Sequence, residues 1–511
     1  MAYKTFAAIY VGSSDISLKI YEIGSKKNFK QLDHISRIIE LGKDTYNKGY
    51  LGTDSIKQVC DILNDFKKKL KEYQITDYKA YTTSAIREAE NEQIVLDTIK
   101  RETNIEVKVL SNSEQRYMIF KGLVACYKDF HQVVSKNTAV IDVGAGSVQI
   151  SLFDKNNMVF TENMHIGALR VRDYVSIMGT KSGRLDKIIA DYVENDIVTF
   201  RNIYLNDKEI KNIVAVGEVA GAVRKIAPEL ALSGKITREQ FDDIYNKIVG
   251  VHPQELSEAY GIPYERATLM LPNIIIYQTF LDNCKAEEVY VPKVDFCDGI
   301  FASYMDEGSR TVFEHNFEED IVASAYALSK KYKSNKNHIE KTTEYSLKIF
   351  DAVKKKYGLG KKERLQLQIA SLLHECGNYI SMQNGAVSSY YIVANTEIIG
   401  LSHKERMEVA NIIKYNVMYL PAKDRISAEL DGCDYMTIAK LTSILRLANI
   451  LDKSHAQKID DISVSIREDN LIVSAKTYED ISLEAGLFET RADFFERVYG
   501  LRPVLRLRRG V

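Results

Sequence analysis

The sequence lacks an excess of charge of either sign. Its 511 residues include 69 Lys and Arg against 70 Asp and Glu, so the formal net charge is −1 at pH 7. A chain without a strong overall charge has no global field that would attract nucleic acid or an anionic membrane. We therefore expect neither of these partners, and any anion-binding site must be built locally from a few residues.

Cysteine and long apolar runs are also scarce. The six cysteines are scattered without a CxxC pair, which argues against a disulfide framework or a zinc knuckle and favours reduced thiols. No stretch approaches the ~20 apolar residues of a membrane span. The opening MAYKTFAAIYVGSSD has no apolar run typical of a signal peptide. We expect a cytoplasmic protein.

Length and pattern divide the chain into three regions. A chain of 511 residues is too long for one core, so several domains are expected. Residues 1–125 and 126–305 both alternate short apolar strands with amphipathic helices, which is typical of sheets covered by helices. Residues 312–511 are mainly helical patterns with a hairpin-like tail, and the polar stretch YMDEGSRTVFEHNF before them suits a linker.

A glycine-containing hairpin opens each of the first two regions. IYVGSSDISLKIYEI starts at Ile9, and VIDVGAGSVQISLFD starts at Val140. Glycine at a hairpin tip lets a phosphate approach the backbone N–H groups without meeting a Cβ atom. Two facing tips would hold a phosphate chain from both sides; the alternative is a pair of ordinary turns. The predicted phosphate-binding residues of the tips are Gly12, Ser13, Ser14, Gly144, Ala145, Gly146 and Ser147.

Several motifs resemble those of one family. The paired hairpins are similar to the phosphate motifs shared by actin, the heat-shock ATPases and the sugar kinases. More narrowly, the chain resembles the exopolyphosphatase/guanosine pentaphosphate phosphohydrolase (Ppx/GppA) family. The segments that carry this resemblance are TTSAIREAEN (82–91), VLSNSEQR (109–116), IDVGAGSVQI (141–150), HIGALRVRDY (165–174) and VDFCDGIFASY (294–304).

The resemblance extends into the third region and implies a fold. HIEKTTEYSLKIFD (338–351), SLLHECGNYIS (371–381) and LRLANILDKSH (445–455) are similar to the HD-type helical domain of longer family members. The implied fold class is α/β, with duplicated ribonuclease H-like domains of the actin/heat-shock ATPase/sugar-kinase superfold at 1–125 and 126–305. An all-α HD-like domain with a small C-terminal β/α tail follows at 312–511.

The resemblance also implies a reaction and its residues. Family members hydrolyse phosphoanhydrides of inorganic polyphosphate or guanosine pentaphosphate with Mg²⁺ or Mn²⁺, and a homodimer is expected. Glu114 matches the glutamate that activates water, and Asp142 matches a carboxylate that holds the metal or orients the water. Ser84 and Arg87 match a segment that contacts the phosphate chain. The alternatives are that Glu114 only caps a helix and that Arg87 forms a surface ion pair.

Departures from the family pattern put this activity in question. Tyr10 stands where the first hairpin of the family carries an aspartate, and a phenol with a pKa near ~10 cannot replace a carboxylate at neutral pH. A glutamate at position 218 would make the site less attractive to a polyanion. The further departures are Gln115, Tyr117, Val148, Gln149 and Val219.

The HD-like region departs from its pattern as well. His338 and His374 are present, but Glu375 replaces the aspartate of the His-Asp pair. A working site of this type needs two histidines, a His-Asp pair and a distal aspartate around a divalent metal. Asn449 occupies the distal position although Asp452 is near, and Ser388 and Asn416 occupy positions where the family often has histidine. Metal binding by His338, His374 and Glu375 therefore competes with the interpretation that these are core residues.

Three hypotheses follow from the sequence. The first is a cytoplasmic phosphohydrolase acting on polyphosphate or guanosine pentaphosphate, with Glu114 and Asp142 as its acidic pair. The second is a weakly active or inactive relative that binds polyphosphate or guanosine tetraphosphate as a sensor. The third is a hydrolase of the HD type on a phosphate-binding scaffold, which Glu375 and Asn449 disfavour. We favour the first.

Overall fold

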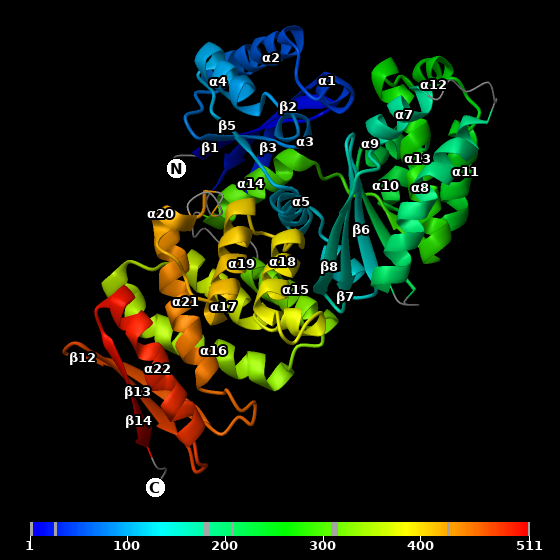
Figure 1. Ribbon diagram of the computed structural model, residues 1–511. Coiled ribbons are helices and arrows are strands. Elements are labelled where there is room, and N and C mark those ends of the chain that lie inside the picture. The colour runs from blue at the N-terminus through cyan, green and yellow to red at the C-terminus, as the bar shows by residue number, and fades with distance from the viewer. Residues whose placement is uncertain are drawn as a thin grey trace. The chain divides into compact units, whose positions relative to one another are not determined.

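Two compact units make up the chain, Met1–Phe317 and Glu318–Val511 (Figure 1). The computed structural model describes residues 4–24, 28–177, 184–205, 209–307, 315–426, 430 and 432–508. The side chains of Glu218 and Ala231 lie outside this description, as does half of the predicted linker, residues 308–314.

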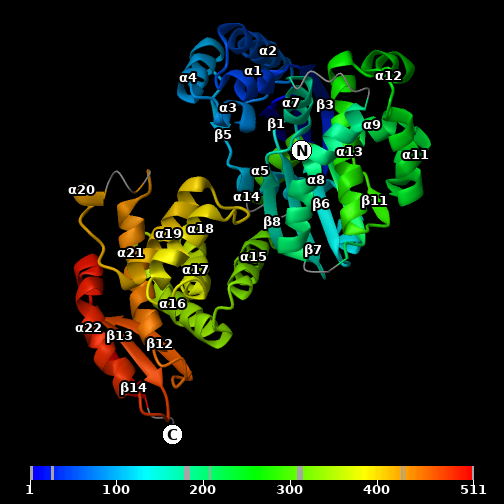
Figure 2. The ribbon, with the colours of Figure 1, turned by 45° about the vertical axis from the view of Figure 1, so that its right-hand side comes forward.

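The first sheet has five strands in the order β3-β2-β1-β4-β5. Its strands are β1 (Lys4–Val11), β2 (Asp15–Ile23), β3 (Phe29–Ile38), β4 (Tyr78–Thr82) and β5 (Val107–Val109). The run from Phe6 to Ile9 is fully buried, because helices cover both faces of the sheet. Figures 1 and 2 place α2 (Thr53–Glu72) and α4 (Glu92–Thr103) over one face, and α5 (Asn112–Cys126) and α14 (Phe296–Glu307) over the other.

The second sheet has six strands in the order β10-β11-β9-β6-β7-β8. They are β6 (Thr138–Val143), β7 (Val148–Asp154), β8 (Asn157–Met164), β9 (Asn212–Gly217), β10 (Lys235–Thr237) and β11 (Glu288–Tyr290). The series β8-β7-β6-β9-β11 repeats the first sheet, with an antiparallel hairpin followed by parallel strands. This repetition confirms the predicted duplicated α/β fold. Buried residues of α7 (Ala168–Ile177), α8 (Leu185–Phe200) and α13 (Tyr264–Cys284) form one core with this sheet.

Shorter helices connect these elements in the first unit. They are α1 (Leu41–Lys48), α3 (Ser84–Arg87), α6 (Phe130–Val134), α9 (Glu218–Ile226), α10 (Pro228–Ser233), α11 (Arg238–Ile248) and α12 (Pro253–Tyr260).

Helix α14 belongs in space to the first sheet, although it follows the second sheet in sequence. It packs against β1, β2 and α5. Phe301 contacts the rings of Phe6 and Tyr21, with ring centroids 6.1 and 4.1 Å away. Lys19 on β2 pairs with buried Asp298 of α14 at 2.9 Å. A division of the chain at residue 125 therefore separates the first sheet from the helix that completes its cover.

The second unit is mainly helical, as the sequence predicts. Its helices are α15 (Phe317–Lys331), α16 (Lys336–Tyr357), α17 (Lys361–Leu373), α18 (Gly385–Asn395), α19 (His403–Val417), α20 (Lys423–Ile426), α21 (Tyr435–Ile450) and α22 (Ser482–Tyr499). The predicted tail forms a small sheet of β12 (Asp461–Arg467), β13 (Asn470–Lys476) and β14 (Arg502–Arg508). Among the described residues of the chain, no helix is long and apolar enough to span a membrane.

Candidate functional site

Both hairpin tips open into one cleft of ≈ 510 Å³ within the first unit. Ser13 and Ser14 line it from the first tip, and the run from Gly144 to Ser147 lines it from the second. The same hydrogen bond closes each tip: the Gly12 N–H donates to the Asp15 carbonyl at 2.8 Å, and the Gly144 N–H donates to the Ser147 carbonyl at 2.9 Å. The two predicted phosphate loops therefore share a geometry and a cavity.

The second tip approaches hydroxyl groups of the first half of the unit. The Ser13, Ser84 and Tyr46 hydroxyls lie 2.9–3.1 Å from one another. A Cβ atom at Gly146 would come within 2.1 Å of the Tyr46 hydroxyl, so only glycine allows this approach. The Arg170 Nε donates to the Gly146 carbonyl at 3.0 Å and fixes the tip from the other side.

Tyr10 lines the cleft as a neutral phenol. Its hydroxyl lies 3.1 Å from the Thr83 hydroxyl, and its ring centroid is 4.4 Å from that of Phe296. Burial raises the pKa of Tyr10 well above its ordinary value, so the hydroxyl keeps its proton at neutral pH. The first hairpin therefore places no negative charge at this position.

Asp142 occupies the equivalent position at the end of β6 and also lines the cleft. Strand β9 runs parallel beside it and ends at Gly217, whose φ is 84°. A Cβ atom at Gly217 would lie 2.7 Å from Asp142 Oδ1, so the glycine leaves room beside the carboxylate. Across the hairpin, Gln149 pairs with Asp142 in the strand register; its side-chain amide is buried and has no partner among the described residues.

Two neighbouring residues of helix α5 have different positions: the Gln115 side chain lines the cleft, and the Glu114 carboxylate caps the helix N-terminus. Glu114 accepts hydrogen bonds from the Ser111 N–H at 2.9 Å and the Ser111 hydroxyl at 2.7 Å, which forms a capping box. Gln115 is among the side chains that line the cleft; Glu114 is not among the lining residues that the structure describes. Glu114 therefore caps α5, and its predicted catalytic role stays a prediction.

Replacement of Glu114 by alanine is expected to act on stability. Loss of the capping box lowers the free energy of unfolding by about 1 kcal/mol, measured by urea denaturation, and leaves activity per folded molecule unchanged. Glu405→Ala is the matched control, because Glu405 makes the same box with Ser402 on α19. A loss of activity in Glu114→Ala without a similar loss in Glu405→Ala would contradict this assignment.

Arg87 supports the loop before α5 and is not one of the described cleft-lining residues. Its guanidinium donates to the Leu110 carbonyl and to the Asn112 side chain. It therefore holds the turn that carries Ser111 and the start of α5. Neighbouring Ser84, in contrast, lines the cleft directly.

Among the side chains that the structure describes, five cations line the cleft against three carboxylates, and sequence reasoning missed all five cations. The cations are Lys19, Arg224, Lys225, Arg266 and Lys293, and the carboxylates are Asp15, Asp142 and Asp295. Arg224 Nη1 and Arg266 Nε are buried without a hydrogen-bond partner among the described residues. Burial lowers the pKa of Arg224, which marks a desolvated cation that a bound anion would stabilise.

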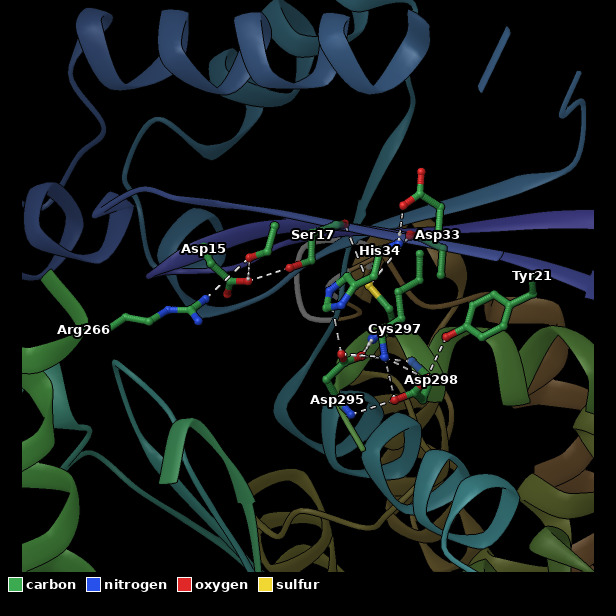
Figure 3. A network of polar contacts seen from close by, with 12 residues as sticks. Asp15, Ser17, Tyr21, Asp33, His34, Arg266, Asp295, Cys297 and Asp298 are labelled. Carbon is green, nitrogen blue, oxygen red and sulfur yellow. Dashed lines mark hydrogen bonds and ion pairs between the residues drawn. The ribbon is translucent and has the colours of Figure 1, made fainter. Parts of the chain in front are cut away.

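A network of polar contacts continues along β2 and β3 (Figure 3). The Ser17 and Ser36 hydroxyls both donate to Asp15, at 2.6 and 3.0 Å. Arg266 extends toward this group from α13, with its Nη2 atom 3.5 Å from Ser36 Oγ. Lys19 is less available for a ligand, because Asp295 and Asp298 hold its amine at 2.6 and 2.9 Å.

The predicted residues of the second site lie together in the helical unit. The Nε2 atoms of His338 and His374 are 3.3 Å apart, and Glu375 Oε1 lies 3.8 Å from His338 Nε2. Burial lowers the pKa of His374 to about 4. His455, which sequence reasoning did not single out as a site residue, joins them.

The chain belongs to a phosphatase family, as matches to two family models show. The Ppx/GppA phosphatase family model matches residues 19–307, and the model of its domain III matches residues 322–489. This confirms the family that the sequence motifs indicated and its long two-part architecture.

Among curated proteins, the chain is 19% identical over 476 residues to a guanosine-5'-triphosphate,3'-diphosphate pyrophosphatase of Photobacterium profundum, covering 92% of this chain and 91% of that protein. It is 22% identical over 316 residues to a bifunctional 3-dehydroquinate synthase/phosphatase of Fusobacterium nucleatum, covering 57% of this chain but only 45% of that enzyme. An exopolyphosphatase structure from Cytophaga hutchinsonii shares the fold, with a TM-score of 0.53 at 19% identity, over 60% of this chain and 98% of that one.

Proposed function

We propose that this chain is a phosphoanhydride hydrolase that releases terminal phosphate from inorganic polyphosphate or guanosine pentaphosphate. The observation that carries the proposal is the cleft: two hairpin tips line it, together with the guanidinium groups of Arg224 and Arg266, each with one buried N–H nitrogen that has no partner in the described part of the chain. Membership of a phosphatase family and similarity to a guanosine-5'-triphosphate,3'-diphosphate pyrophosphatase support it.

A divalent cation fits this cleft only if the substrate supplies most of its ligands. Mg²⁺ in phosphoryl-transfer sites is held by one or two carboxylates together with substrate phosphates. Asp142 provides one carboxylate, with space beside Oδ1 because residue 217 is glycine. Asp142 would hold Mg²⁺ or Mn²⁺, which when bound neutralises charge on the phosphates.

The residues of this chain would then bind and orient the phosphate chain. Residues 13–14 and 144–147 of the tips surround the phosphate nearest to Asp142; Gly12, which was predicted with them, is not among the described cleft-lining residues and makes room for the Tyr10 ring. Arg224 and Arg266 bind phosphates farther along the cleft through N–H groups that have no partner among the described residues. The Asp142 carboxylate accepts a hydrogen bond from the attacking water and orients it toward phosphorus.

Arg224→Gln and Arg266→Gln are each expected to weaken ligand binding about 10–100-fold, because each removes a charge-assisted hydrogen bond worth about 1.5–3 kcal/mol. The measurement is equilibrium binding of polyphosphate at fixed salt. Arg201→Gln serves as the control, since Arg201 is an exposed residue outside the described cleft lining. Equal polyphosphate affinity in the natural chain and in all three variants would show that the phosphate chain binds elsewhere.

A second candidate is binding without turnover, as in a sensor of polyphosphate or guanosine tetraphosphate. The specific observation is that three positions near Asp142 are uncharged. Tyr10 keeps its proton, and Gln115 and Gln149 carry amides. Tyr10 and Gln115 line the cleft and can form hydrogen bonds with a ligand, whereas none of the three side chains can accept a proton from water.

The two candidates are separated by measuring binding and turnover on the same protein. Phosphate release from long-chain polyphosphate and from guanosine pentaphosphate is followed with Mg²⁺ or Mn²⁺, beside equilibrium binding of both ligands and of guanosine tetraphosphate. Turnover supports the hydrolase. Saturable binding with no release over many hours supports the sensor, and absence of both overturns the assignment of the cleft.

A further inference from the structure

Three arginines meet in the helical unit, where α21 packs against both α19 and α22 (Figure 1). Arg446 on α21 has its Cζ atom 4.3 Å from the ring centroid of Phe494 on α22, and Arg497 has its Cζ atom 5.8 Å from the same centroid. Arg491 lies one helical turn before Phe494, on the same side of α22. These three residues form the arginine cluster, and the proposed hydrolysis uses none of them.

Arg446 is a buried cation, with only 6% of its surface exposed. Its Nε donates to the Tyr415 carbonyl at 2.8 Å, and its Nη2 donates to the Met418 carbonyl. These bonds satisfy carbonyl groups at the end of α19 but do not neutralise the charge. Burial, together with the charges of the two neighbouring arginines, lowers the pKa of Arg446 to about 10, so it stays protonated at neutral pH.

The arginine cluster has no carboxylate partner in the part of the chain that the structure describes. Three carboxylates of α22 pair with Arg502 on β14 instead, at 3.5, 2.6 and 2.9 Å: Glu489, Asp493 and Glu496. Helix α22 thus directs these acids to the sheet and its arginines to α21. A desolvated cation without a counter-ion raises the free energy of the folded chain, and a bound anion lowers it again.

We propose that the arginine cluster binds one phosphate group, either free orthophosphate or the phosphate of a small phosphomonoester. Three guanidinium forks offer more N–H donors than one carboxylate can accept, whereas a phosphate dianion brings two charges and at least three acceptor oxygens. The Phe494 ring stacks beneath two of the forks and holds them in place. Single-stranded nucleic acid fits less well, because it binds along a groove of cations with successive stacking aromatics, and this cluster is one spot.

The test uses the absence of tryptophan from the chain. Phe494→Trp gives the full-length protein a single fluorescent reporter that still stacks against guanidinium groups. Its emission is followed during titration with orthophosphate, methyl phosphate or acetate at constant ionic strength. Saturation by both phosphates supports a site for a phosphomonoester, and saturation by orthophosphate alone supports a site for the free ion. No saturable response to either phosphate, or an equal response to acetate, in a chain that is folded by circular dichroism would overturn the proposal.

Variants in the Phe494→Trp chain identify the ligand groups. Arg491→Gln and Arg497→Gln are each expected to raise the half-saturating phosphate concentration about 10–100-fold, because each removes a charge-assisted hydrogen bond. Arg446 is left in place, since its loss would also leave carbonyl groups of α19 without donors. Arg508→Gln is the matched control, because Arg508 is an exposed arginine on β14. Equal half-saturation in all of these chains would contradict the assignment.

A last variant separates the arginine cluster from the cleft of the first unit, which also carries cations. Arg224→Gln in the Phe494→Trp chain is expected to keep the same half-saturation at the reporter, whatever its effect on polyphosphate binding. A parallel loss of the reporter signal in Arg224→Gln would show that the reporter follows anion binding in the cleft and would overturn the proposal. The inference therefore stands or falls independently of the proposed hydrolysis.

Discussion

Replacement of Asp142 by asparagine is expected to lower phosphate release by about 10²–10⁴-fold, the range associated with loss of a group that positions or activates the attacking water. Asp142 is the penultimate residue of β6, next to the second tip, and Tyr10 at the equivalent position of the first hairpin is neutral. Initial rates with polyphosphate at saturating Mg²⁺, together with binding of the same ligand, check the prediction. Binding should fall much less than turnover.

Asp154→Asn is the matched control, because Asp154 ends the neighbouring strand β7 and is not among the described cleft-lining residues. A rate within a few-fold of the natural chain in Asp142→Asn would show that water is oriented by another group. A proportional fall in binding and turnover would assign Asp142 to ligand binding alone.

Replacement of Gln115 by glutamate is expected to raise phosphate release by about 10²-fold, because a carboxylate at this cleft-lining position adds a general base where the chain now has an amide. The substitution keeps the size of the side chain and leaves the cap made by Glu114 intact. The gain should appear in kcat more than in KM, since the proton is transferred only in the transition state. Gln93→Glu on the exposed face of α4 is the control.

An unchanged rate in Gln115→Glu would exclude this position as the missing base. Tyr10→Asp is a less direct test of the same idea. It removes a ring that packs against Phe296 and is expected to destabilise the first unit by about 3 kcal/mol or more. Tyr10→Phe separates the hydroxyl from the ring and is expected to leave activity unchanged.

The duplicated fold could be predicted from the sequence because the same hairpin pattern occurs twice. Each hairpin shows an apolar strand, a glycine tip and a second strand, and each opens a β/α series. The return of α14 to the first sheet could not be predicted this way, because its partners on β1 and β2 precede it by more than 270 residues. Local periodicity carries no information about contacts at that distance.

The site was predicted in part. The tips and Asp142 follow from local sequence, since a strand that ends in glycine fixes where the next residues lie. Glu114 and Gln115 are adjacent, and one of the two side chains forms the helix cap while the other lines the cleft. The Ser-x-x-Glu pattern at 111–114 was the available signal for that choice. Arg224 and Arg266 come from separate helices, and only the tertiary fold brings them to one cavity.

The position of α14 in the sequence means that the first sheet is completely covered only late in protein synthesis. Strands β1 and β2 end by Ile23, whereas the helix that covers their Phe6, Lys19 and Tyr21 side chains begins at Phe296. At about 5–20 residues per second, the ribosome needs roughly 15–55 s to supply that cover. During this interval the nascent sheet exposes apolar surface and a lysine whose carboxylate partner does not yet exist. The first half of the unit therefore cannot mature as an independent domain, and a fragment ending before residue 296 would be a client for chaperones rather than a soluble phosphate-binding module.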